Sequence, residues 1–478
     1  MNYSGYTLED MDRNSLFHPL TSIATHIDKG PQIMASGHGV RLRDHSGREM
    51  VDCSGGLWCV NIGYGRPEIA ETAKQAILDL NYFHLFGSSS NEAAIRLADK
   101  VLNLLHENTG AKMSRVFFGC SGSDANDTNY KLVRYYSNLR GKPAKKKIIS
   151  RTGGYHGLTA AAASLTGTPS YHKAWDLPLS GVVHTSCPHF FRFANESESE
   201  AAFCDRMIAE IEVIIEDEGA DTIGAFIAEP IMGTGGVLLP PIGYFSRLQA
   251  LLDQHDILLI VDEVITGFGR TGNWFGTGLY DLKPDMITLA KGITSAYFPV
   301  SASVISQRVW NVLEKASPEY GPVMHGFTYS GHPVGAAIGL TNIAIMESEN
   351  LVDNAAVVGK YLLQGLRERV GDHEHIGEIR GEGLMIGVEF TADRAKRRPF
   401  EATSYPHRLV AGRALEQGLM VRALPFIEVV SFSPPLCITK SDCDEAIDHF
   451  ARTMDLATPE LHRLAKDCEA VQAIGPAT

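Results

Sequence analysis

The sequence contains no apolar run long enough to cross a membrane. Ile257–Val261 is among its longest runs, and it falls far short of the roughly 20 residues that a membrane-spanning helix needs. The N-terminal residues also lack a basic stretch followed by an apolar one, so no secretory signal is visible. We therefore expect a cytoplasmic protein without a membrane partner.

Positive charge is in short supply. The 43 lysines and arginines are outnumbered by 56 aspartates and glutamates, which gives a formal net charge of -13. An acidic chain argues against nucleic acid or an anionic membrane as a partner. The first ~40 residues also show no helix-turn-helix pattern. We therefore expect no nucleic-acid partner.

Closely spaced cysteine pairs are absent. The eight cysteines are scattered, and none forms a C-x-x-C motif. That spacing predicts neither a zinc site nor a thioredoxin-like redox pair, so we expect no metal. Free thiols in a reducing compartment are the expected state.

What is present is the pattern of an α/β protein. Short apolar or β-branched runs alternate with amphipathic helical stretches through the middle of the chain. Near-continuous apolar strands separated by helices indicate a mainly parallel sheet with both faces covered. The predicted strands are Arg115–Phe118, Lys147–Ser150, Ile223–Ala228, Ile257–Val261 and Met286–Ala290.

The pattern changes after about Gly335. Longer helices, Ala336–Glu347 and Asn354–Val370, are followed by shorter strands such as Gly387–Phe390 and Glu428–Phe432. This indicates a separate α+β domain at the C-terminus. We expect an N-terminal arm and part of the small domain over 1–68, a large cofactor-binding domain over 69–335, and a C-terminal small domain over 336–478.

The residues at the predicted strand ends carry most of the functional information, because ligands of open α/β sheets bind there. The first strand ends in Gly119–Asn126, where Ser121, Gly122 and Ser123 precede a helix. Small residues and a helix N-terminus favour an anion such as phosphate. An ordinary helix cap is the alternative, because the stretch fits neither G-x-G-x-x-G nor the Walker pattern.

Two further strand ends could contact a planar cofactor. Tyr155 and His156 lie in the glycine-rich stretch Gly153–Gly157, where the tyrosine could stack on a ring or simply pack in a turn. Asp262 follows a buried strand, where a carboxylate is costly unless it meets a cation or hydrogen-bond donors. A protonated pyridine nitrogen is one such partner. The alternatives are a helix cap and a surface ion pair.

Lys291 follows the apolar run Met286–Ala290. A lysine that leaves a buried strand into a crevice is a candidate Schiff-base amine. A solvated lysine at the start of a loop is the alternative. Together, the strand ends supply a phosphate cradle, a stacking aromatic, a pyridinium partner and an amine, which is the set that pyridoxal 5′-phosphate (PLP) requires.

Longer motifs extend this interpretation over nearly the whole chain, from about Gly39 to Asp455. On these motifs the sequence resembles the class III PLP-dependent aminotransferases of fold type I, particularly the omega-amino acid:pyruvate branch. The resemblance implies a mainly parallel seven-stranded sheet flanked by helices, plus a small α+β domain built from the N- and C-terminal segments. The motifs are Gly56–Gly65, Glu229-Pro230, Asp262–Gly272 leading to Lys291-Gly292, Gly326–Pro333 and Arg380–Met385.

The resemblance implies a role for each cofactor-binding residue. Lys291 would hold PLP as a Schiff base and then act as the acid and base of a 1,3-proton shift. Asp262 would bond to the pyridine nitrogen, and Thr328 would reach the phosphate of a neighbouring subunit together with Phe327. A homodimer or tetramer with shared sites follows. The other implied cofactor contacts are Ser121, Gly122, Ser123, Tyr155, His156, Glu229 and Val264, the last on the ring face opposite Tyr155.

The resemblance also implies substrate contacts. Trp58, Phe86 and Tyr155 would line the amine pocket. Arg422 would pair bidentately with the carboxylate of a keto acid, and a structural salt bridge is its alternative role. Departures from the family are Asp124 for a glutamate, Leu20 for a phenylalanine, Thr234 for a smaller residue, and a longer segment over 423–426. Of these, Leu20 and Thr234 are expected to shape the pocket.

The expected reaction is a two-step, ping-pong transamination from an amine or omega-amino acid donor to pyruvate, through pyridoxamine phosphate, with alanine as a product. A decarboxylase or aminomutase on the same fold is the alternative. A non-catalytic sensor is disfavoured because Lys291 is present.

Overall fold

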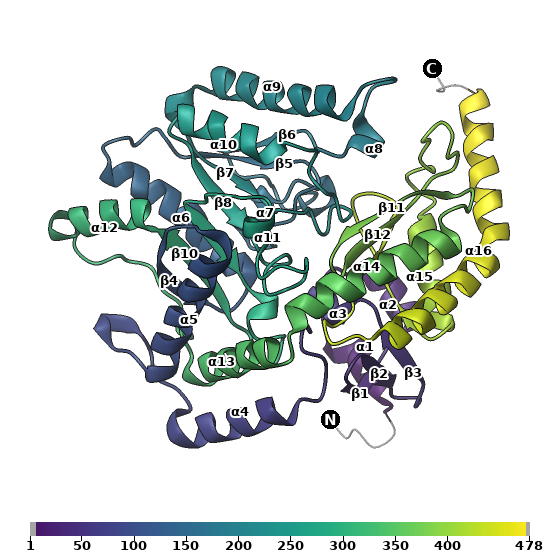
Figure 1. The fold of residues 1–478 in the computed structure, drawn as a ribbon, viewed down its shortest axis with the longest axis horizontal. Helices are drawn as coiled ribbons and strands as arrows, with labels where there is room; N and C mark the ends of the chain where they lie inside the picture. The colour runs from purple at the N-terminus through teal and green to yellow at the C-terminus, as the bar shows by residue number, and fades with distance from the viewer. Residues whose placement is uncertain (1–5, 475–478) are drawn as a thin grey trace.

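A seven-stranded sheet forms the centre of the structure, a computed structural model that describes residues 6–474 (Figure 1). The strand order is β4-β10-β9-β8-β7-β5-β6. Only β10 runs antiparallel to its neighbours, so the predicted α/β fold with a mainly parallel sheet is confirmed. The strands are β4 (Met113–Gly119), β5 (Lys147–Arg151), β6 (Val182–Thr185), β7 (Ile223–Ala228), β8 (Leu258–Asp262), β9 (Met286–Leu289) and β10 (Ser301–Ser306).

Helices cover both faces of this sheet. On one face, Leu259 and Val261 of β8 pack in a buried cluster with residues of α9 (Glu200–Glu218) and α10 (Tyr244–Gln254), which lie together above the sheet in Figure 1. On the other face, alternate residues of the same strand pack against α6 (Gly122–Leu139) and α12 (Gln307–Tyr320). Because both faces are buried, the strands read as continuous apolar runs rather than as alternating patterns.

The two ends of the chain share a second region. There β3 pairs in parallel with β13, so that Val51 lies opposite Leu419. A second sheet in the order β11-β12-β15-β14 is antiparallel throughout. The strands of the sheet that contains β3 and β13 are β1 (Met34–His38), β2 (Arg41–Asp44), β3 (Glu49–Asp52) and β13 (Leu419–Met420). The strands of the antiparallel sheet are β11 (Ile376–Glu382), β12 (Met385–Phe390), β14 (Arg422–Ala423) and β15 (Val429–Phe432).

Three long helices complete this region, and the C-terminal one runs along its outer edge (Figure 1). They are α14 (Leu351–Val370), α15 (Pro406–Glu416) and α16 (Lys440–Ile474). Helix α16 continues past Asp455 and includes Pro459.

The remaining elements connect these units. The N-terminal helices α1 (Leu8–Ser15) and α2 (Ile23–Lys29) contain no buried residue, and α13 (Pro333–Ser348) packs against α4 (Pro67–Leu80) and α5 (Glu92–Thr109). The shorter helices are α3 (Gly55–Trp58), α7 (Ala160–Leu165), α8 (Phe190–Phe193), α11 (Gly276–Leu279), η1 (Phe86–Ser88), η2 (Pro169–Tyr171), η3 (Ala220–Thr222) and η4 (Lys291–Ile293).

Strand β10 had no clear signal in the sequence, because its buried face is partly polar. Ser301 donates a hydrogen bond to Asp124, and Ser303 donates one to Asn129, both on α6. Polar partners on α6 therefore replace the apolar layer that marks the other strands. All eight cysteines are free thiols, and within 6–474 no helix is both long enough and apolar enough to cross a membrane.

Candidate active site

A cavity of about 150 Å³ lies at the carboxyl ends of β7, β8 and β9, beside the N-terminus of α6. Parallel strands bring their ends to one edge of a sheet, and this explains why residues far apart in the sequence meet here. The cavity is lined by Gly122, Ser123, Tyr155, His156, Gly157, Glu229, Asp262, Val264, Ile265, Ala290 and Lys291.

Asp262 is a buried carboxylate held in one orientation. Its Oδ2 accepts hydrogen bonds from Asn126 Nδ2 and His156 Nδ1, each at 2.8 Å. Its Oδ1 accepts the backbone N–H of Val264 at 3.1 Å. A carboxylate offers about four lone-pair directions, so one remains for a further donor. These contacts to internal groups contradict the alternative of a surface ion pair.

Lys291 stands opposite, directly after β9. Its φ of 48° lies in the left-handed region, which a lysine seldom adopts. Within the described part of the chain, its amine forms no hydrogen bond or ion pair. Burial lowers the pKa of the Lys291 amine, and the nearby Arg422 guanidinium lowers it further, against opposing contributions from Cys59, Asp262 and Glu229. Both lowering effects favour the neutral, nucleophilic form.

The start of α6 borders the cavity, at the place where the sequence predicts a phosphate site. Ser121 caps the helix by accepting the N–H of Asp124, whose carboxylate in turn accepts the N–H of Ser121 and Cys120. At Gly122, an added Cβ would come within 3.0 Å of Val264, so only glycine leaves the space open. Free N–H groups at a helix N-terminus favour an anion. Asp124 therefore keeps a capping role in place of the family's glutamate.

Glu229 fixes the wall of the cavity next to Tyr155. Its Oε1 accepts the backbone N–H of Tyr155 at 3.0 Å, and its Oε2 accepts that of Gly233 at 2.9 Å. Burial raises the pKa of the Glu229 carboxyl. Burial also raises the pKa of Tyr155 to about 12, which keeps its ring neutral. The stacking roles of Tyr155 and Val264 stay predictions.

Arg422, on β14, lies close enough to Lys291 to lower its pKa. Burial also lowers the pKa of the arginine itself, while Tyr171 and Tyr155 act in the opposite direction. In the described residues its guanidinium has no carboxylate within ion-pair distance. The half-buried guanidinium therefore does not form, within the described residues of one chain, the structural salt bridge that was its alternative role, and its pairing with a keto acid stays a prediction.

The remaining predicted substrate residues, and Thr328 of the predicted cofactor contacts, are not among the residues that line the cavity of the same chain. Trp58 is 1% exposed and packs in a buried cluster, and Thr234 is also buried. Leu20 is 64% exposed and Phe86 is 51% exposed. Thr328 is exposed as well, and its carbonyl accepts the hydroxyl of Tyr82 at 2.8 Å. The roles of these residues stay predictions.

Sequence reasoning missed two neighbours of the site. Asn126 is fully buried and holds both Asp262 and the carbonyl of His156. The signal available was a polar residue on the buried face of α6, four positions after Gly122. Cys59 is the other, because its thiol lies within electrostatic reach of Lys291 and Arg422. Nothing in its spacing indicated this.

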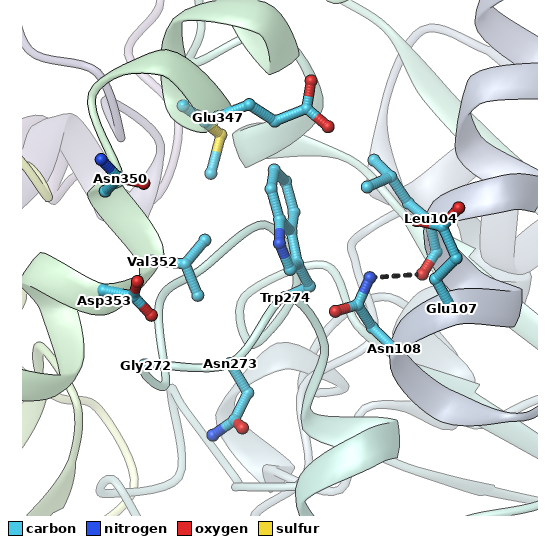
Figure 2. Close-up of a pocket in the computed structure, with 11 residues that line it drawn as sticks. Leu104, Glu107, Asn108, Gly272, Asn273, Trp274, Glu347, Asn350, Val352 and Asp353 are labelled. Atoms are coloured by element: carbon cyan, nitrogen blue, oxygen red, sulfur yellow. Dashed lines mark hydrogen bonds between the residues drawn. The ribbon is translucent and has the colours of Figure 1, made fainter.

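A larger cavity of about 470 Å³ lies between the end of α5 and the junction of α13 and α14. Figure 2 shows that the indole of Trp274 lines this cavity, with Glu107 on one side and Asp353 on the other. It contains none of the predicted site residues, and so the chemistry of the smaller cavity is the one that matches the sequence.

Comparisons with known proteins agree with this geometry. A family model described as aminotransferase class-III matches residues 23–454. A diaminobutyrate--2-oxoglutarate transaminase of Halomonas elongata is 45% identical, over 95% of this chain and 97% of its own. A chloroplastic gamma aminobutyrate transaminase of Solanum lycopersicum is 39% identical, over 94% and 84%. An omega transaminase structure from Pseudomonas jessenii in complex with PMP superposes with a TM-score of 0.92 at 42% identity, over 95% and 99%.

Proposed function

Because this chain belongs to the class III aminotransferases, PLP-dependent enzymes of fold type I, we propose that it transfers an amino group from an amine or omega-amino acid to pyruvate. Alanine is the product of the second half-reaction. The observation that carries this proposal is the half-buried guanidinium of Arg422, which forms no ion pair among the described residues and lies near the Lys291 amine.

The cavity fits PLP on three independent features. Asp262 has an acceptor position left for a ring N–H, the N-terminus of α6 offers N–H groups for a phosphate, and the Lys291 amine has no partner among the described residues. When bound, PLP supplies an electron sink for the charge that develops on the substrate carbon.

The protein's own residues supply the proton handling. Lys291 is the one lysine among the described residues that line the cavity, and its lowered pKa suits it both to covalent attachment and to proton transfer at the substrate carbon. Asp262 holds its orientation through Asn126 and His156, so its charge is in place before the substrate arrives. Asp262 and Glu229 are buried, and a low-dielectric surrounding strengthens their electrostatic effects.

The number of free cations supports a keto acid with one carboxylate. Arg270 also lies close to Cys59, but its guanidinium is occupied by the carbonyls of Leu384 and Pro434 and by Asn61. Of these two arginines in the described part of the chain, Arg422 is the one whose guanidinium is still available for a substrate. Pyruvate needs one such partner, whereas 2-oxoglutarate, which the Halomonas elongata relative carries in its name, has two carboxylates to neutralise.

The experiment that tests the function separates the two halves of the reaction. Purified holoenzyme is mixed with each of a panel of amines and omega-amino acids without acceptor, and the absorbance of the bound cofactor is followed. Pyruvate or 2-oxoglutarate is then added. We expect pyruvate to restore the starting spectrum and to yield alanine. Restoration by 2-oxoglutarate alone would overturn pyruvate as the acceptor, and no spectral change with any amine would overturn transamination.

Arg422→Leu provides the sharper prediction. Removing one partner of a buried charge pair costs about 2–5 kcal/mol, so kcat/KM for pyruvate should fall by about 30-fold or more. The rate of the first half-reaction with an amine that lacks a carboxylate should change little. Arg413→Leu, an arginine of α15 that pairs with Glu416 and Glu460, is the control. Equal losses in both half-reactions would contradict the assignment of Arg422 to the keto acid.

We also propose that the working unit is a dimer in which Phe327 and Thr328 complete the site of the other copy. Two observations support this proposal. The aromatic ring of Phe86 is exposed, and it lies against the segment that contains Gly326. An added Cβ on Gly326 would come within 2.9 Å of the Phe86 ring. Both the ring and Thr328 are exposed in the single chain, and exposed apolar surface of this kind marks a contact between proteins.

Co-expression of two variants tests the dimer. Thr328→Ala alone should weaken PLP binding by about tenfold or more, since a hydrogen bond to a charged group contributes about 1.5–3 kcal/mol. A hybrid of Thr328→Ala with Lys291→Ala contains one site with both residues intact. We expect that hybrid to bind one cofactor with wild-type affinity, as measured by equilibrium dialysis. Weak binding by every site of the hybrid would exclude sharing across the subunits.

A further inference from the structure

Two histidines and a glutamate meet at a place that the reaction does not use. Glu374 and His375 lie between α14 and β11, and His462 lies on α16. One ligand atom of each is within 4.8 Å of the other two. His462 Nε2 is 2.7 Å from Glu374 Oε1, and the rings of His375 and His462 are 5.2 Å apart.

The orientation of His375 distinguishes this cluster from a surface ion pair. The side chain is 3% exposed, and its Nδ1 lies 3.2 Å from the carbonyl oxygen of Thr391. A carbonyl only accepts, so Nδ1 carries the proton and the lone pair of the neutral ring is on Nε2. That Nε2 is buried and has no hydrogen-bond partner among the described residues. A buried polar atom without a hydrogen-bond partner lowers the stability of the fold.

A histidine held in this way is typical of a metal ligand. Metal-bound imidazoles usually donate their second N–H to a carbonyl or carboxylate, which fixes the tautomer and the ring direction. Here the carbonyl of Thr391 plays that part for His375. The neighbouring His373 is not available, since its Nε2 bonds to Thr458 and its Nδ1 accepts the N–H of His375.

We propose that His375, His462 and Glu374 bind a divalent transition-metal ion of the Zn²⁺ type. Imidazole nitrogens with one carboxylate suit this class of ion, at ligand distances of about 2.0–2.2 Å. The side chains of Glu374 and His462 are 66% and 44% exposed, so water completes the coordination and both groups can adjust. The ion joins α16 to the turn before β11.

Two other clusters of metal-ligating side chains lack this combination. His189, Glu378 and Glu389 meet in the interior, but Arg380 and Arg192 already neutralise Glu389. In the N-terminal arm, His18 and His26 each lie within 3.0 Å of Asp12. In the described part of the chain, neither ring is fixed by a backbone carbonyl. The arm cluster therefore also combines two histidines with a carboxylate, but it lacks the backbone carbonyl contact that fixes His375. It serves as a control.

The test uses the PLP-loaded full-length protein, freed of metal with EDTA and desalted. Zn²⁺ is titrated by calorimetry, and Co²⁺ is added separately while its visible absorption is recorded. We expect one equivalent to bind and to raise the midpoint of thermal unfolding, because an ion that binds the folded state stabilises it. His462→Ala should weaken binding by about tenfold or more and abolish the stabilisation, whereas His18→Ala should leave both unchanged.

The variants make the proposal falsifiable. His462 lies on the surface of α16, and its replacement leaves the buried His375 in place, so the protein should still fold; its circular dichroism checks this. Unchanged Zn²⁺ affinity in His462→Ala would overturn the site. So would loss of binding in His18→Ala, since the ion would then sit in the arm. Absence of binding to the unmodified protein would also reject it.

Discussion

Lys291→Ala is expected to lower transamination by about 10⁴-fold or more, since it removes both the covalent attachment and the group that transfers the proton. The cofactor should still bind, because Asp262 and the N-terminus of α6 are untouched. Borohydride reduction followed by denaturation is the decisive measurement. The unmodified protein should retain the cofactor covalently, and Lys291→Ala should release it.

Two controls accompany this measurement. Lys291→Arg keeps the positive charge without a usable nucleophile and should be as inactive as the alanine variant. Lys74→Ala changes an exposed lysine that pairs with Glu71 on α4 and should behave as the unmodified protein. Retention of more than about a tenth of the activity in Lys291→Ala would show that another amine does the work, against the expectation from nucleophilic catalysis.

Asp262→Asn should produce the second-largest loss, about 10²–10³-fold in kcat, which is the typical effect of removing one preorganised electrostatic group. The amide has nearly the same shape but no charge. It also places an NH₂ group either against two donors, Asn126 and His156, or against the N–H of Val264. The measurement is the single-turnover rate with a saturating amine, together with the spectrum of the bound cofactor.

Asp127→Asn is the matched control for that experiment. Asp127 is also on α6, but it accepts hydrogen bonds from Thr159 and from the N–H of Ala162, outside the cavity. Its replacement should lower stability slightly and leave the single-turnover rate unchanged. Similar rates for Asp262→Asn and the unmodified protein would exclude the carboxylate as the partner of the cofactor ring.

The strand-end residues were predictable from sequence for a physical reason. Parallel strands end at a common edge, so Tyr155, Asp262 and Lys291 had to approach one another once each strand was identified. The cavity confirms that they do. The motifs that resemble the family then supplied Arg422, whose place beside Lys291 no local pattern indicates.

Other features depended on contacts that no local pattern records. Asn126 belongs to the site because α6 turns that face toward β8, and the helix pattern does not specify which strand it meets. Strand β10 was not predicted from the sequence, because Ser301 and Ser303 interrupt its apolar pattern. Their hydroxyls form hydrogen bonds with α6 instead. Leu20 and Phe86 are exposed in one chain, and a single sequence gives no geometry for a second copy.

The pairing of β3 with β13 has a consequence for how the protein is made. Val51 leaves the ribosome long before Leu419, its partner across the strand pair. Translation proceeds at about 5–20 residues per second, so the edge of the N-terminal sheet at β3 stays unpaired for roughly 20–70 s. Unpaired edges invite association with other chains. Newly synthesised protein should therefore depend on chaperones during this interval, and folding of the two ends can finish only after translation is nearly complete.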